Sequence, residues 1–380
     1  MTTRFASAPG LTVEKTVRYC ALCHAVYRSD FQWCPNDGGP LELSSTDPLI
    51  GETIDHYVID ALIGEGAMGR VYRAHHSRLI NRRYAVKVLL GDLAASSQMR
   101  ARFAQEAENA SRLDHPNAVG VIDFGRTALG LQYIVMDLVE GTTLSEILRA
   151  GPLSPARVIR IAHQLCEALD HAHGRGVIHR DFKPENILVV GEAGRDLARI
   201  ADFGLALSVT SDVRLTTTGV ACTPVYAAPE QLRTGTFDHR VDLYGLGVTM
   251  FEMLSGGILP FGGTYDEAIG AKLAHDAPSI LTVAPNVPPG LVALVARLLA
   301  RDPNQRPRSA QAVIHALEGA LQSPGVLPQS SASAEPAAPP RRRSGAALVV
   351  AILAIATGTL IGWTSDSPPT AQLISAHRVP

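Results

Sequence analysis

The sequence lacks an excess of charge of either sign. Its 380 residues include 34 lysines and arginines against 36 aspartates and glutamates, a net charge of 34 − 36 = −2. Such a balance argues against a basic nucleic-acid-binding protein and against an acidic disordered one. We therefore expect no nucleic-acid partner.

Cysteine is also scarce. Three of the five cysteines lie between Cys20 and Cys34, and the other two are Cys166 and Cys222. This number and spacing exclude the disulfide framework of a small secreted protein. No apolar run in the first twenty residues is long enough for a secretory signal, so we expect reduced thiols and a cytoplasmic N-terminus.

One long uncharged run stands near the C-terminus. Residues 346–363 read AALVVAILAIATGTLIGW, which is just long enough to cross a hydrocarbon core. Arg341, Arg342 and Arg343 precede it, and the positive-inside tendency then leaves the preceding chain in the cytoplasm. We expect a single-pass transmembrane helix over 345–363 in the cell membrane and a short extracytoplasmic tail over 364–380. The alternative is a buried core helix.

Two further features bear on this attachment. Residues 321–344 are rich in proline, serine and alanine, a composition that cannot bury enough apolar surface to fold, and they read as a linker. Gly358 and Gly362 are four residues apart, a spacing at which two spanning helices can pack closely. A homodimer is therefore a further hypothesis.

The body of the chain changes character along its length. Residues 57–63, 70–74 and 84–90 predict strands, because they are short, rich in β-branched residues and separated by turn signals. Apolar residues at helical spacing follow in 98–113, 155–173 and 291–299. Two unequal lobes with a cleft between them are expected. A polar, proline-ended break over 43–48 separates them from a cysteine-bearing segment, residues 1–50.

The first candidate motif is GEGAMGRV, with glycines at 64, 66 and 69. Glycines let a hairpin backbone approach phosphate oxygens that any Cβ would hold away. Lys87 follows in a predicted strand and offers an ammonium for phosphates. Each signal alone is weak, since a turn or a solvated edge lysine would look the same.

The signal sharpens at residues 179–186, HRDFKPEN, which are followed by Asp202-Phe203-Gly204. Asp181 can accept a hydroxyl proton and Lys183 can steady transferring charge. Asn186 and Asp202 offer oxygens to a cation. Phosphoryl transfer needs mostly positioning and charge neutralisation, and these groups supply both.

With these motifs in order, residues 57–320 resemble a bacterial Hanks-type serine/threonine protein kinase. Ala228-Pro229-Glu230 matches the segment that closes the activation loop. Asp242 is similar to the aspartate that anchors the catalytic loop, and Arg306 to the arginine that pairs with Glu230. The resemblance implies an α+β bilobal protein kinase fold with a small β-rich N-lobe and a larger helical C-lobe, preceded here by a small zinc-ribbon-like module.

The resemblance also implies roles for single residues. Asp181 would be the catalytic base, Lys183 the phosphate-facing lysine, and Asn186 with Asp202 the ligands of magnesium or manganese. Lys87 would pair with Glu106, with Glu108 as the alternative. The implied ATP-binding residues are Ile63, Gly64, Glu65, Gly66, Ala67, Met68, Gly69, Val71, Ala85, Lys87, Glu106, Met136, Asp137, Leu138 and Leu188.

Arg180, directly before Asp181, implies control by activation-loop phosphorylation, because an unpaired arginine there favours an anion. Thr216, Thr217 and Thr218 are the candidate acceptors, with Thr217 first, and a plain polar loop is the alternative. Thr223 is expected to contact the substrate hydroxyl. Cys222 departs from the family, which usually has glycine there, and leaves a thiol near the cleft.

The N-terminal segment carries its own motif. Cys20 and Cys23, and after ten residues Cys34, resemble a short zinc ribbon in which two tight turns aim ligands at one ion. Asp37 stands where a fourth cysteine would complete the pattern, and His24 is the alternative ligand. The competing interpretation is three free thiols in a flexible arm.

The sequence thus predicts a membrane-tethered serine/threonine protein kinase that uses ATP and protein substrates. A pseudokinase scaffold or binding module is the first alternative, although Lys87, Glu106, Asp181, Asn186 and Asp202 are all present. A small-molecule phosphotransferase is the second alternative, and it would need neither the 228–230 segment nor the threonine-rich loop. A third is that the cysteine module defines the function, with the kinase as its output.

Overall fold

The computed structural model describes residues 17–27, 31–66, 69–191, 194–203, 225–233 and 237–322. They all belong to the first of two compact units, 1–328, and the second unit is 329–380. The segment predicted to span the membrane, most of the linker, the tail and Thr216–Thr218 lie outside the described residues. None of the helices in the described part combines the length and hydropathy that a membrane span requires.

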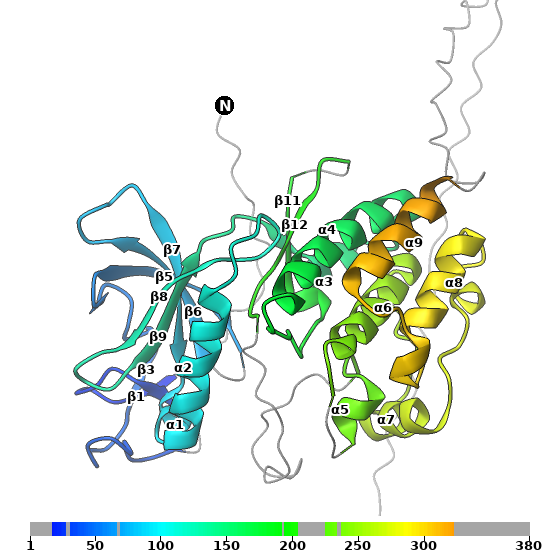
Figure 1. Ribbon diagram of the computed structural model, residues 1–380. Coiled ribbons are helices and arrows are strands. Elements are labelled where there is room, and N and C mark those ends of the chain that lie inside the picture. The colour runs from blue at the N-terminus through cyan, green and yellow to red at the C-terminus, as the bar shows by residue number, and fades with distance from the viewer. Residues whose placement is uncertain are drawn as a thin grey trace, which may run out of the picture. The chain divides into compact units, whose positions relative to one another are not determined.

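The β-rich part is built on an antiparallel six-stranded sheet (Figure 1). Its strand order is β4-β5-β6-β7-β9-β8, so every neighbouring pair except β7-β9 is consecutive in the chain. β7 carries the YAVKVL run that the sequence marks as a strand, and it pairs with β6 and β9. The strands are β4 (Thr53–Ile54), β5 (Tyr57–Glu65), β6 (Gly69–His76), β7 (Arg83–Leu89), β8 (Val121–Arg126) and β9 (Gln132–Asp137).

The two faces of this sheet are covered differently. Side chains alternate along a strand, so Val86 and Val88 of β7 join one buried cluster while Ala85 and Leu89 join another. The second cluster includes Phe103 of α2 (Ser97–Ser111), a helix preceded by the short α1 (Gly91–Ala94). The Ser96 side chain begins α2 by accepting a hydrogen bond from the N–H of Met99.

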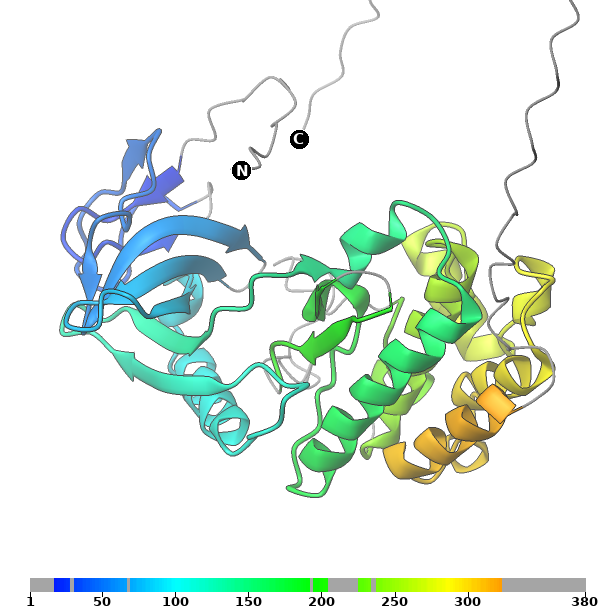
Figure 2. The same cartoon turned by 90° about the horizontal axis from the view of Figure 1, so that it is seen from above.

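The first cluster is completed by the cysteine segment. β1 (Val17–Tyr19), β2 (Val26–Tyr27) and β3 (Glu42–Ser44) form a small sheet of order β2-β1-β3. The segment packs its buried cysteines into the cluster that contains Val86, so the break at 43–48 does not hold it apart in space. Figure 2 shows this small sheet and α2 on different sides of the larger sheet.

The helical part is organised around α6 (Arg240–Ser255), whose residues 241–254 are all buried. A helix that is buried on every side lies in the centre of a domain. Glycines let its neighbours approach: a Cβ at Gly245 would lie 2.9 Å from the carbonyl oxygen of Phe182. The other helices here are α3 (Leu144–Leu148), α4 (Pro155–His173), α5 (Pro229–Leu232), α7 (Tyr265–Ala274), α8 (Pro289–Leu298) and α9 (Ala310–Gln322).

A second small sheet, β10-β11-β12, presents the candidate catalytic residues. Its strands are Thr142–Thr143, Ile187–Val190 and Leu197–Ile200. The segment before β11 carries residues 179–186, and the chain after β12 leads directly to Asp202. A small β-rich part and a larger helical part therefore follow one another, as the sequence predicts, with strands and helices at the expected places.

Candidate functional site

Buried Asp242 at the start of α6 holds the catalytic loop in place. Its carboxylate accepts hydrogen bonds from the backbone N–H groups of His179 (2.9 Å) and Arg180 (2.8 Å) and lies 2.8 Å from Nε2 of His173. Burial would raise the pKa of Asp242, but these hydrogen bonds and the neighbouring histidines outweigh it and lower that pKa. The loop is therefore fixed by an anion in the core.

Asp181, Lys183 and Asn186 meet at the end of this loop. Nζ of Lys183 lies 2.7 Å from Oδ2 of Asp181. The amide of Asn186 donates to the same oxygen at 3.3 Å and to the Asp181 carbonyl oxygen at 2.9 Å. The three residues predicted to be catalytic are thus in mutual contact, and two donors converge on one carboxylate oxygen.

Lys87 on β7 reaches Asp202 across the two parts of the fold. Its Nζ lies 2.9 Å from Oδ2 of Asp202, and its side chain is nearly buried. The alignment-based partner Glu106 lies on α2, but its side chain is outside the described residues. In the described part of the chain, Lys87 and Asp202, the aspartate expected to bind a cation, therefore form an ion pair.

Two backbone positions near the reacting groups have left-handed conformations. Arg180 has φ of +68° and Asp202 has φ of +58°. Such values are uncommon for non-glycine residues and concentrate at functional sites. Hydrogen bonds hold the adjoining segments together, because His179 Nε2 lies 3.0 Å from the Ala201 carbonyl oxygen and the N–H of Ala201 donates to the Asn186 carbonyl oxygen.

The glycine-rich hairpin joins β5 to β6. The N–H of Gly66 donates to the carbonyl oxygen of Gly69 (2.9 Å), and a Cβ at Gly69 would clash with the carbonyl oxygen of Val88. Glu65 lies 3.1 Å from Arg70, which also pairs with Asp47 of the cysteine segment at 2.8 Å. Ala67 and Met68, at the tip, lie outside the described residues.

Five of the apolar residues that the resemblance implies for ATP binding gather in one cluster on the α2 side of the sheet. Ile63 is not among them, and its side chain is 48% exposed. The N–H of Asp137 donates a hydrogen bond to the Gly120 carbonyl oxygen at 3.0 Å. The residues in the cluster are Val71, Ala85, Met136, Leu138 and Leu188.

The segment after residue 224 is tied to the catalytic loop. Arg306 binds Glu230 through two hydrogen bonds of 2.6 and 2.8 Å, as the resemblance implies. Gln231 of α5 donates to the carbonyl oxygen of Arg180 at 3.0 Å. The position of this segment is therefore set relative to Asp181.

The cysteine segment contains two turns of one design. In each, the N–H of the fourth residue after a cysteine donates to that cysteine's carbonyl oxygen: His24 to Cys20 (2.9 Å) and Gly38 to Cys34 (2.8 Å). Both donors have positive φ, +57° for His24 and +74° for Gly38. Three residues after each leading cysteine stand Cys23 and Asp37, so Asp37 occupies the position of a second cysteine.

The four side chains of these turns converge. Their ligand atoms all lie within 4.8 Å of one another, with the Cys20 sulfur 2.9 Å from Asp37 Oδ2 and the Cys23 and Cys34 sulfurs 3.8 Å apart. Tetrahedral zinc with bonds of about 2.3 Å to sulfur places two sulfurs about 3.8 Å apart. Burial and the hydrogen bond to Asp37 raise the pKa of the Cys20 thiol to about 12.

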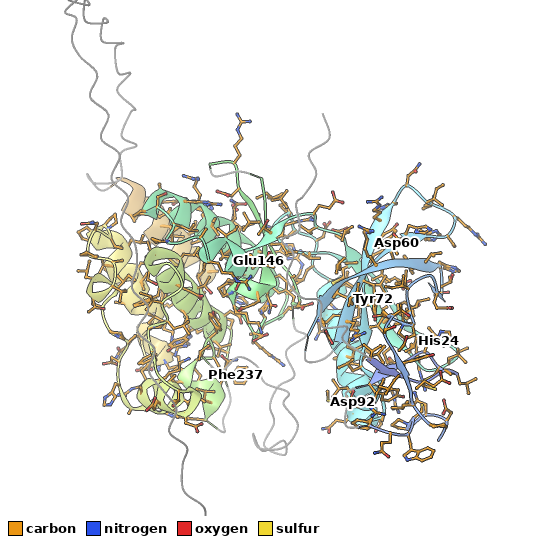
Figure 3. All side chains as sticks on the ribbon, turned by 180° about the vertical axis from the view of Figure 1, so that it is seen from behind. His24, Asp60, Tyr72, Asp92, Glu146 and Phe237 are labelled. Carbon is orange, nitrogen blue, oxygen red and sulfur yellow. The ribbon has the colours of Figure 1, made fainter. Side chains whose placement is uncertain are left out.

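His24, the other ligand considered, does not belong to this group of four. Its Nδ1 lies 3.9 Å from Glu52, and Figure 3 places it in the β-rich part that also contains Tyr72. The aromatic ring of Tyr27 connects the cysteines to the β-rich lobe. Its hydroxyl lies 3.1 Å from the Cys34 sulfur, and a Cβ at Gly91 of α1 would overlap its ring.

Sequence reasoning did not find three residues that the structure places at the site. His173 contacts Asp242, Gln231 contacts Arg180, and Lys272 of α7 donates to two carbonyl oxygens just before Ala228. Each lies in a helix far along the chain from its partner. No local pattern marks such contacts, whereas Asp242 and Arg306 stand in recognisable motifs.

The chain is similar to known proteins. The Protein kinase domain family model matches residues 57–317. Curated relatives include the serine/threonine-protein kinases pkn3 of Myxococcus xanthus, 38% identical over 84% of this chain, and PknJ of Mycobacterium tuberculosis, 36% identical over 84%. The chain spans 60% and 55% of the lengths of these two proteins.

Solved structures support the same assignment. The crystal structure of the Mycobacterium tuberculosis PknI kinase domain matches with a TM-score of 0.58 at 29% identity, covering 71% of this chain and 98% of that one. The predicted α+β bilobal kinase fold is confirmed. With a family model matched over more than half of its length, the chain belongs to the protein kinase family.

Proposed function

We propose that the protein transfers the γ-phosphoryl group of ATP to serine and threonine hydroxyls of proteins. The observation that carries this proposal is the convergence of Lys183 and Asn186 on the Asp181 carboxylate, together with the ion pair between Lys87 and Asp202. A scaffold that had lost the chemistry would have no need for this complete set of groups. The names of the curated relatives point to the same activity.

The arrangement assigns a task to each side chain. Asp181 accepts the proton of the substrate hydroxyl. The hydroxyl oxygen attacks the γ-phosphorus, and the bond between that phosphorus and the ADP oxygen breaks. Lys183, 2.7 Å from that carboxylate, stabilises negative charge between base and phosphate. Lys87 binds the nonreacting phosphates. Asn186 and Asp202 would hold magnesium or manganese, which neutralises charge on the phosphate oxygens when bound.

The substrate class is tested by phosphoamino-acid analysis. The full chain is incubated with γ-labelled ATP, magnesium and casein, and the labelled protein is hydrolysed in acid. We expect phosphoserine and phosphothreonine. Phosphotyrosine alone, or transfer only to small molecules, would contradict the proposal.

We also propose that Thr216, Thr217 or Thr218 is autophosphorylated and that the phosphate engages Arg180. In the described part of the chain, the buried Nε of Arg180 has no hydrogen-bond partner, and its guanidinium lies 5.9 Å from the ring of Phe237. An unsatisfied buried cationic nitrogen favours a nearby anion. Phosphosite mapping of active enzyme with no phosphate between residues 207 and 220 would contradict this.

We further propose that Cys20, Cys23, Cys34 and Asp37 bind one zinc ion. Support comes from the matching turns, the convergence of the four ligand atoms, and a donor set of three thiolates and one carboxylate that zinc accepts. The test is metal analysis of the full chain beside Cys20→Ser and Asp37→Ala. One zinc per chain is expected, with loss in both variants, and an unchanged zinc content in Asp37→Ala would instead favour His24.

We propose, finally, that residues 345–363 anchor the kinase in the cell membrane, with the catalytic domain in the cytoplasm and 364–380 outside. Length, hydropathy and the preceding arginines support it. Gly358 and Gly362 would allow two such helices to pair. A full chain that is released from membranes by alkaline carbonate would contradict anchoring, and unchanged self-association after replacing both glycines by isoleucine would contradict pairing.

A further inference from the structure

A buried lysine on α7 joins two parts of the helical lobe. Lys272 is 1% exposed, and its Nζ donates to the carbonyl oxygens of Val225 (2.6 Å) and Ala227 (2.8 Å). Burying an ammonium group is unfavourable unless hydrogen bonds compensate for lost hydration. Two bonds to alternate carbonyl groups of one stretch fix both the position and the direction of that backbone.

The ring of Tyr244, in α6, links this lysine to a second cation. Nζ of Lys272 lies 5.3 Å from the ring centroid, and the guanidinium carbon of Arg306 lies 4.9 Å from it. Arg306 in turn binds Glu230 through two hydrogen bonds. Both cations contact one buried aromatic side chain, and between them they hold both ends of residues 225–230.

The held segment borders the catalytic loop. Gln231 accepts a hydrogen bond from the N–H of Ala228 at 2.8 Å and donates to the carbonyl oxygen of Arg180 at 3.0 Å. Arg180 directly precedes Asp181. A shift of residues 225–228 would therefore move the surroundings of the base, while Lys87 and Asp202, which face ATP, belong to other elements.

We propose that Lys272 is a positioning residue for the protein substrate. It fixes residues 225–228, which directly follow the predicted substrate-contacting Thr223, so that the acceptor hydroxyl reaches Asp181. Its two hydrogen bonds are both with the helical lobe, so we expect the KM for ATP to be little affected by its removal. This inference rests on the proposed kinase activity.

The test compares the KM for the protein acceptor with the KM for ATP. The full chain and its Lys272→Met variant are assayed with a catalytically inactive Asp181→Asn copy as protein acceptor, and ATP hydrolysis without acceptor is measured in parallel. Loss of two charge-assisted hydrogen bonds predicts a KM for the acceptor raised about tenfold or more. The KM for ATP and the acceptor-free hydrolysis rate should stay within about twofold of wild type.

A matched variant separates positioning from stability. Arg301→Met removes a 2.6 Å hydrogen bond to the Ala274 carbonyl oxygen at the end of α7 without touching residues 225–228. We expect it to leave both KM values unchanged. If Lys272→Met does not fold, Lys272→Gln is used instead; it keeps an amide donor but loses the charge, so it should raise the acceptor KM by a smaller factor and leave the KM for ATP unchanged.

Three results would overturn the inference: an unchanged acceptor KM, a parallel rise in both KM values, or an equal effect of Arg301→Met at equal thermal stability. A wild-type chain that hydrolyses ATP but phosphorylates no acceptor would instead contradict the proposed function. Failure of the two ideas can therefore be told apart.

Discussion

The catalytic residues and the cysteine cluster are both convergent groups of polar side chains, but different forces hold them. The catalytic groups come from β7, the loop before β11 and the chain after β12, and the fold places them through anchors such as Asp242. The three cysteines and Asp37 of the proposed zinc site come from two short turns within residues 20–37. Once the thiols are deprotonated, their negative charges would need a cation to balance them.

This difference shows where preorganisation comes from. In the catalytic site, the chain's own residues balance one another's charges, as in the ion pair of Lys87 with Asp202. The site therefore needs no ATP to form. In the cysteine cluster, burial favours neutral thiols over thiolates, so the cluster would reach its charged form only with a metal. Removing a side chain should therefore stop chemistry at the first site and folding of the segment at the second.

The largest effect should come from the base. Asp181→Asn keeps the shape of the side chain but cannot accept the hydroxyl proton, so we expect kcat to fall by about 10²- to 10⁴-fold with little change in stability. Steady-state phosphotransfer and thermal unfolding measure the two quantities. Asp276→Asn, at an exposed position, is the control. A kcat within about threefold of wild type would remove Asp181 from its role.

The anchor should affect both stability and activity. Asp242→Ala leaves two backbone N–H groups and His173 without their carboxylate, and breaking a buried pair typically costs about 3–5 kcal/mol. Urea unfolding measures the loss, with exposed Asp114→Ala as its control. A loss no larger than that of the control would show that the loop is held by other contacts.

Metal removal should affect the cysteine segment and spare the catalytic groups. If the free zinc concentration is about 1,000 times the dissociation constant, removing the zinc lowers the free energy of unfolding by about 4 kcal/mol. Cys34→Ala should abolish both the zinc content and this chelator effect. Cys166→Ala changes a buried cysteine in α4 and should alter neither, so equal zinc content in the two variants would argue against the site.

The smallest effect concerns pH. Burial raises the pKa of Glu252 to about 7, although its hydrogen bond from Tyr226 acts in the opposite direction. Because the folded pKa exceeds the unfolded value of about 4.3, stability should fall as pH rises from about 4.5 to 7 and then level off. Glu252→Gln should flatten this decline, which we expect to be about 1–3 kcal/mol. Parallel pH profiles for the two proteins would contradict the assignment.

Much of the fold and the catalytic set could be predicted because its signals are local. The strand around Lys87, the loop with Asp181 and the pair of turns with Cys20 and Cys34 each bring their chemistry within a few residues. Such segments also show the period of their secondary structure. The order of these motifs then indicates the two-lobed arrangement.

The remaining contacts depend on tertiary packing. A lysine in a helix such as α7 normally predicts an exposed position, yet Lys272 is buried against carbonyl groups 45 and 47 residues away in the chain. The packing of the cysteine segment on the sheet through Tyr27 and Gly91 likewise has no local signature, and a polar, proline-containing stretch suggested separation. The hydrogen bond from the N–H of Asp137 to the carbonyl oxygen of Gly120 likewise has no local signature.

The most direct test of the account is transfer of label from γ-labelled ATP by the full chain with magnesium, beside Lys87→Met and Asp202→Asn, with the labelled sites mapped. The account predicts label on Thr216, Thr217 or Thr218 in wild type and none in either variant. Measurable ATP binding without any label in wild type would contradict it and would favour a scaffold that retains the kinase fold without its chemistry.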